Sequence, residues 1–164
     1  IEGLGPSPAM LEARLAQRPE ERLRLWVDDL HRLSGRAPRR YGSLEEAYER
    51  MQAENPHLSE TQARHLTIHG SNQNEDGTFS WKFDNYVRAT SPYLFNVHDA
   101  RELWGKITCP TLLLRGTESW ANDPVKDGRA SAFQNYRFYN IANAGHWVHH
   151  DQLQVFLKML EKFL

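Results

Sequence analysis

The last third of the chain constrains the fold most strongly. Leu112, Leu113 and Leu114 form a continuously apolar run that stops at Gly116, which is the pattern of a parallel strand buried on both faces. A polar segment follows, which we expect to be helical, and then an alternating run over residues 136–141. Two strand-turn-helix units in succession predict an α/β sheet.

Both predicted strands end in turns with side chains suited to catalysis. Glu118 follows the first strand, and His146 follows the second after the small-residue turn Ala144-Gly145. In α/β sheets such chemistry gathers beyond the carboxyl ends of the strands. A carboxylate that orients a histidine, which then acts as general base, is two thirds of a nucleophilic triad. The sequence therefore predicts a His146 base at this edge of the sheet.

These segments resemble the C-terminal part of an α/β-hydrolase over residues 107–164. The resemblance rests on the order of Pro110 to Gly116, a second strand, Ala144 to Gln152 and a closing helix. The Gly145-His146-Trp147 turn resembles the family's histidine loop, which implies that His146 is the catalytic base. Residues 2–6 and 116–120 are similar to segments of the serine hydrolase-like proteins. The implied fold class is α/β, a partial α/β-hydrolase fold with a helical cap followed by the last core strands and helices.

The family's nucleophile, which precedes the acid and the histidine on a G-x-S-x-G elbow, has no counterpart here. Ser71 and Ser119 both lack the flanking glycines, and Cys109 precedes a strand instead of following one. We therefore expect a C-terminal fragment that is cut after its nucleophile helix and is inactive alone. Its open sheet edges would favour aggregation or pairing with the missing N-terminal half of the same protein.

The acid of the triad has three candidates. The family's usual position is occupied by Ser119, so Glu118, one residue earlier, is the first. Glu2 ranks almost equally with Glu118 as the triad acid. Glu2 and the loop to Pro6 resemble the segment in which haloalkane dehalogenases and a few other hydrolases carry their acid. Asp123 ranks third. A glutamate in such a loop also serves as a simple turn cap.

The resemblance divides the chain into three parts. Residues 1–6 are the end of a core strand, residues 7–97 a mostly helical cap or lid, and residues 98–164 the C-terminal part of the core. An apolar stripe after Pro19 and capping boxes at Ser43 and Ser59 predict helices in the second part. The basic loop at residues 36–40 is interpreted as a solvated turn.

Four aromatic residues are candidates for the substrate pocket. Trp81 and Phe83 alternate on one face of an extended segment, while Trp120 and Trp147 flank the two turns. Their rings favour a small apolar acyl or alkyl substrate over a charged one.

Composition narrows the remaining classes of function. A net charge of -1 offers no general attraction to nucleic acid or to an anionic membrane. No apolar run approaches the ~18 residues of a membrane span, and a single cysteine favours a reducing, cytoplasmic location. A metal site at His149, His150 and Asp151 is disfavoured, because no H-E-x-x-H pattern is present. We expect no cofactor.

The sequence thus predicts a hydrolase of ester, thioester or amide bonds in the full-length protein, with a Ser-His-acid triad. Two alternatives stay open. An aspartate nucleophile would give an enzyme like a haloalkane dehalogenase or an epoxide hydrolase, and a degenerate elbow would give a non-catalytic binding protein on the same fold.

Overall fold

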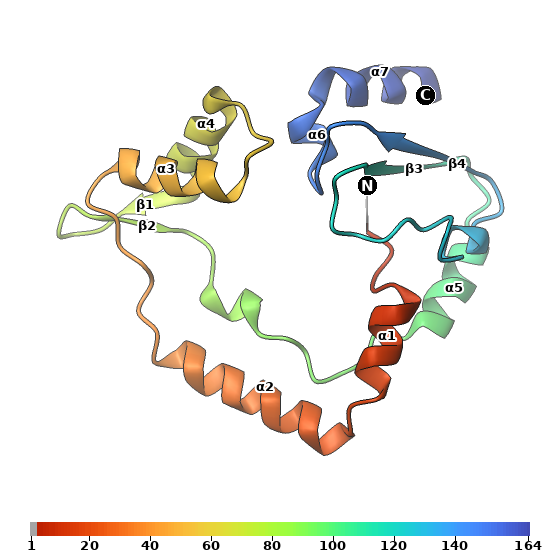
Figure 1. Cartoon of the computed structure of the whole chain (residues 1–164), viewed down its shortest axis with the longest axis horizontal. Coiled ribbons are helices and arrows are strands. Elements are labelled where there is room, and N and C mark those ends of the chain that lie inside the picture. Colours follow the sequence, from red (N-terminus) through yellow and green to blue (C-terminus); the bar gives the residue numbers. More distant parts are fainter. Residues whose placement is uncertain (1–2) are drawn as a thin grey trace. The chain divides into compact units, whose positions relative to one another are not determined.

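The computed structural model describes residues 3–164, which form two compact units (Figure 1). One unit contains the chain up to Ala16 together with Leu94–Leu164, and the other contains Gln17–Tyr93. Helix α1 (Pro8–Leu15) belongs to the first unit. Ser7, the residue before it, is buried, and Leu4 packs against the cluster around Leu113. The division of the chain into a cap and a core stays a prediction.

The first unit is built on a parallel pair of strands, β3 (Thr111–Gly116) and β4 (Tyr136–Ile141). Their register places Leu113 opposite Phe138 and Gly116 opposite Ile141. Leu113 and Leu114 are 8% and 4% exposed although they point to opposite faces. The predicted parallel strand, buried on both faces, is confirmed.

Helices cover the two faces of this strand pair (Figure 1). On one face, Leu114 packs with Ile141 and with Val148 of α6 (Val148–Asp151), and α7 (Leu153–Phe163) adds two partly buried side chains, Phe156 and Met159. On the other face, Leu113 packs with Phe133, whose ring stacks on Trp104 of α5 (Val97–Gly105). Burial on both faces is what an α/β sheet requires.

One sequence expectation in this unit is wrong. The polar segment between β3 and β4 forms turns and one short 3₁₀ helix, η2 (Ala130–Ala132), instead of an α-helix. Asp151 is the last residue of α6 and directly precedes Gln152, the N-cap residue of α7. On α7, Leu153 and Leu157 are 44% and 40% exposed.

The second unit consists mainly of helices. They are α2 (Pro19–Ser34), α3 (Leu44–Glu54) and α4 (Glu60–Gly70), followed by a hairpin of β1 (Ser71–Gln73) and β2 (Phe79–Trp81) and by the 3₁₀ helix η1 (Asn85–Arg88). Pro19 occupies the first turn of α2, and Ser59 and Gln62 form the predicted capping box of α4. No helix in the described part of the chain is long and apolar enough to cross a membrane.

The turns after β3 and β4 touch at Gly116. A Cβ atom on Gly116 would lie 2.1 Å from the carbonyl oxygen of Gly145 and 2.2 Å from that of Ala144. Both distances are far inside van der Waals contact, and both neighbours are backbone atoms that cannot rotate away. Only glycine therefore allows the two turns to approach each other in this way.

We predict that Gly116→Ala lowers the free energy of unfolding by about 1–3 kcal/mol, because the added methyl group forces the two backbones apart. Gly105→Ala is the matched control, since its Cβ atom would meet the nearest atom at 3.7 Å. Urea unfolding followed by tryptophan fluorescence measures both. Equal stability of the Gly116 and Gly105 variants would contradict the close approach.

Candidate functional site

The turn that carries His146 is held by the side chains of Asp151, the last residue of α6, and of Gln152, which lies between α6 and α7. The Gly145 backbone N–H donates to the Asp151 carboxylate at 2.8 Å, and the Gln152 side chain donates to the Asn143 carbonyl oxygen at 3.0 Å. Asn143 has φ 52, a left-handed conformation that asparagine tolerates better than most residues. Asp151 and Gln152 thus fix the backbone on which His146 stands.

The turn after β3 is bonded to the histidine turn through the backbone. The N–H groups of Thr117 and Glu118 donate to the carbonyl oxygens of Ile141 and Ala144, both at 2.9 Å. The Asn143 N–H donates in turn to the Thr117 hydroxyl at 3.2 Å. The two turns predicted to form the site therefore lie against each other, as the parallel register of β3 and β4 requires.

Aromatic rings flank His146, which is partly buried. The rings of Trp120 and Trp147 have their centroids 4.7 Å and 5.3 Å from that of the imidazole. Both tryptophans are more than half exposed, at 72% and 54%. The structure thus places two of the four predicted pocket residues at the histidine.

Trp81 and Phe83 belong to the other unit, Gln17–Tyr93. The indole N–H of Trp81 donates to the Tyr41 hydroxyl at 3.0 Å, and Phe83 lies under the guanidinium group of Arg88. That these two rings approach His146 stays a prediction.

The candidate acids differ in their surroundings. Glu118 has an exposed side chain on the turn next to the histidine. The Asp123 carboxylate accepts the N–H groups of Val125 at 2.9 Å and Lys126 at 3.3 Å, so it caps a turn. Glu2 lies outside the described residues. The hydrogen bonds of the Asp123 carboxylate thus serve its own turn. The choice between Glu118 and Glu2 as the triad acid stays a prediction.

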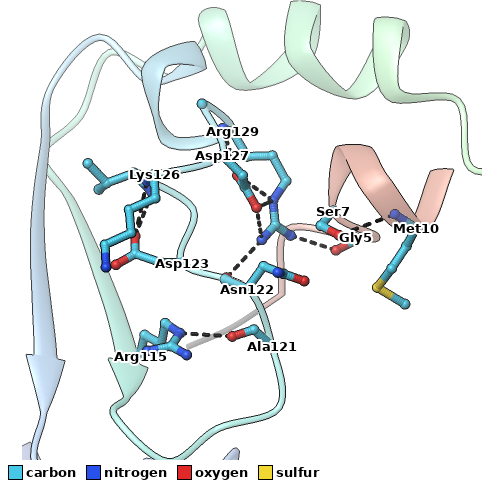
Figure 2. Close-up of polar contacts among 12 residues, drawn as sticks. Gly5, Ser7, Met10, Arg115, Ala121, Asn122, Asp123, Lys126, Asp127 and Arg129 are labelled. Carbon is cyan, nitrogen blue, oxygen red and sulfur yellow. Dashed lines mark hydrogen bonds and ion pairs between the residues drawn. The ribbon is translucent and has the colours of Figure 1, made fainter. Parts of the chain in front are cut away.

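A buried arginine, which sequence reasoning missed, organises the loop between β3 and β4 (Figure 2). Arg129 is 6% exposed and forms an ion pair with Asp127 at 2.8 Å. It also donates to the carbonyl oxygens of Gly5 at 2.8 Å and Asn122 at 2.9 Å. A buried charge is stable only when its hydrogen-bonding groups have partners, and Arg129 finds them on three separate segments.

Arg115 stabilises the start of the same loop. Its guanidinium group donates to the carbonyl oxygens of Ala121 at 2.9 Å and Ser119 at 3.2 Å, and Figure 2 shows the first of these bonds. The loop that begins at Glu118 is therefore shaped by two arginines that bond carbonyl oxygens. Nothing in the sequence marks these acceptors, because every residue carries a carbonyl group.

A cavity of about 180 Å³ lies between this loop and the segment after Gly3. Its apolar wall includes Leu4, Met10, Leu113 and Trp120, and Arg115 and Arg129 border it. Trp120, which lines the cavity, also contacts the His146 ring. Such a mostly apolar recess with a few polar groups is typical of small-molecule sites.

His149 is not suited to the role of the base. Burial lowers the pKa of this histidine, and the neighbouring His150 adds to the effect. Its Nδ1 atom is buried and has no hydrogen-bond partner, while its ring packs near Phe156. Across residues 3–164, no group of three or more His, Cys, Asp or Glu side chains is placed to hold a metal ion.

The strand pair, its flanking helices and the histidine turn form part of an α/β-hydrolase fold. Among curated proteins, Esterase YbfF of Escherichia coli (strain K12) is 25% identical over 114 aligned residues, and the match covers 65% of this chain and 45% of that protein. No protein-family profile matches the chain.

Two solved structures show the same fold. A thioesterase domain from the curacin biosynthetic pathway has a TM-score of 0.72 at 22% identity, over 89% of this chain and 52% of that one. An M. tuberculosis esterase has a TM-score of 0.67 at 16% identity, over 89% and 51%. The chain therefore spans about half the length of the proteins it matches.

We predict that Arg129→Ala destabilises the protein by about 3–5 kcal/mol, because it leaves the partly buried Asp127 carboxylate without its cation and removes the bonds of a buried guanidinium group. Arg24→Ala removes an exposed Arg-Asp pair on α2 and should change stability little. Urea unfolding compares the two variants. If both variants lost a similar amount of unfolding free energy, the buried contacts of Arg129 would contribute no more to stability than an exposed ion pair.

Proposed function

We propose that this chain is the C-terminal part of an α/β-hydrolase that cleaves ester, thioester or amide bonds, with His146 as the general base. The observation that carries this proposal is the bonded pair of turns at the ends of β3 and β4, one bearing Glu118 and the other His146. The esterase and thioesterase names of the similar proteins support the hydrolytic class.

In the proposed mechanism a serine outside this chain attacks the carbonyl carbon while His146 accepts its proton. His146 then gives the proton to the leaving group, which departs and leaves the acyl group bonded to the serine. In the second half of the reaction a water molecule attacks this acyl-enzyme, and His146 again accepts a proton and returns it to the serine. A carboxylate holds the imidazole in the correct tautomer and stabilises its cation. The oxyanion is bound by backbone N–H groups beside the nucleophile, which the N-terminal half would supply.

We propose an apolar acyl or alkyl group as the recognised part of the substrate. The apolar wall of the cavity beside Trp120 supports this choice, since apolar groups gain free energy when they leave water. An upstream G-x-S-x-G would indicate the serine mechanism. An upstream G-x-D-x-G would indicate a dehalogenase or epoxide hydrolase instead, and a degenerate elbow a binding protein.

We predict that His146→Ala, in the protein assembled with its N-terminal half, lowers the turnover of p-nitrophenyl esters by roughly 10⁴-fold. His98→Ala is the matched control, because His98 is an exposed histidine on α5 and should leave turnover unchanged. Short and medium-chain esters are compared in the same assay. Full activity of the His146 variant would refute the proposed base.

A second prediction concerns the acid. Only one carboxylate can be the primary acceptor of the imidazole N–H that faces away from the nucleophile. Of Glu118→Gln and Glu2→Gln, one should therefore lose about 10⁴-fold in turnover, and the other should lose at most about 1 kcal/mol of stability. If neither variant slows turnover, the acid is wrongly assigned and Asp123 is tested next.

A further inference from the structure

The unit Gln17–Tyr93 contains a hollow of about 240 Å³ with an unusual lining. Four arginines border it, together with three aromatic rings. The arginines are Arg36, Arg39, Arg50 and Arg88, and the rings belong to Tyr41, Trp81 and Phe83. The loop that supplies Arg36 and Arg39 was expected to be a simple solvated turn, but it forms one wall of this hollow.

Three of these arginines have no anionic partner among the residues that the structure describes. Arg50 is paired with Glu54, the one carboxylate in the lining. No carboxylate among residues 3–164 lies within ion-pair distance of Arg36, Arg39 or Arg88. The hollow therefore carries an uncompensated positive charge, which attracts anions.

The rings hold two of the guanidinium groups in place. The Arg39 guanidinium carbon lies 5.4 Å from the centroid of the Tyr41 ring, and that of Arg88 lies 5.1 Å from the Phe83 ring. A guanidinium group placed over a ring keeps its N–H donors free for a second partner, and their fork matches the oxygens of a phosphate.

The floor of the hollow is rigid. Tyr41 is 3% exposed, pairs with Phe79 through two backbone hydrogen bonds of 2.9 and 2.8 Å, and accepts the indole N–H of Trp81. Rings that are fixed in this way offer an apolar face on which a flat group can stack without a large loss of side-chain entropy.

We propose that this hollow binds a small phosphate monoester whose flat ring contacts Trp81 and Phe83 and whose phosphate bonds Arg39 and Arg88. A volume of about 240 Å³ lies below the roughly 300–1,000 Å³ of sites for drug-sized ligands, so a single ring with its phosphate is the matching size. The proposal does not depend on the hydrolytic function, because the hollow lies entirely within one unit.

Phenyl phosphate tests the proposal by isothermal titration of the chain. Saturable binding is expected, and it should weaken by roughly tenfold or more in Arg39→Gln and in Arg88→Gln. Arg88→Lys should weaken it too, because lysine keeps the charge but not the fork. The matched control is Arg137→Gln, which removes an exposed arginine of the other unit without an ion-pair partner among the described residues.

Four results would overturn the proposal. The first three are no saturable binding, equal binding of neutral benzyl alcohol, and equal weakening by Arg137→Gln. The fourth is tighter binding of inorganic phosphate than of phenyl phosphate, since the rings would then have no role. Far-UV circular dichroism confirms that each exposed substitution leaves the fold intact. Binding should persist in His146→Ala, which separates this site from the proposed hydrolase.

Discussion

The contact between Gly116 and the Ala144-Gly145 backbone is the constraint on which the candidate site depends. Parallel pairing brings the carboxyl ends of β3 and β4 to one edge, but the two turns meet only because Gly116 has no side chain. The bonds from Thr117 and Glu118 to the second turn follow from this approach. The site is thus assembled by backbone atoms first, and its side chains are presented by a framework that is already fixed.

Much of the fold could be predicted because its signals are local. The apolar run Leu112 to Leu114 and the capping residue Ser59 act on neighbours a few positions away, where sequence spacing and distance in space agree. The turn bearing His146 was found for a similar reason, since its residues are contiguous. Asp151 lies in the same contiguous segment as His146. Its hydrogen bond with the Gly145 N–H could not be predicted from the sequence, because it depends on how the turn folds back on α6.

The rest depends on contacts between distant segments. Arg129 bonds a carbonyl oxygen of Gly5, 124 positions away, and no pattern of side chains identifies such an acceptor. Arg115 and Arg129 together explain why the polar segment after β3 is not an α-helix. The carbonyl oxygens of Ser119, Ala121 and Asn122 accept hydrogen bonds from Arg115 and Arg129, so this part of the backbone is satisfied without helical bonds.

Arginines serve two different purposes in this chain, and their partners distinguish them. Arg129 is buried, and a buried charge requires acceptors within the protein, which it finds. Arg36, Arg39 and Arg88 are exposed, so the fold does not need them to be paired. Their mutual repulsion around one hollow is a small cost to stability. An anion in the hollow would remove that cost, and this is the physical basis of the proposed binding site, whereas the buried arginine serves the fold.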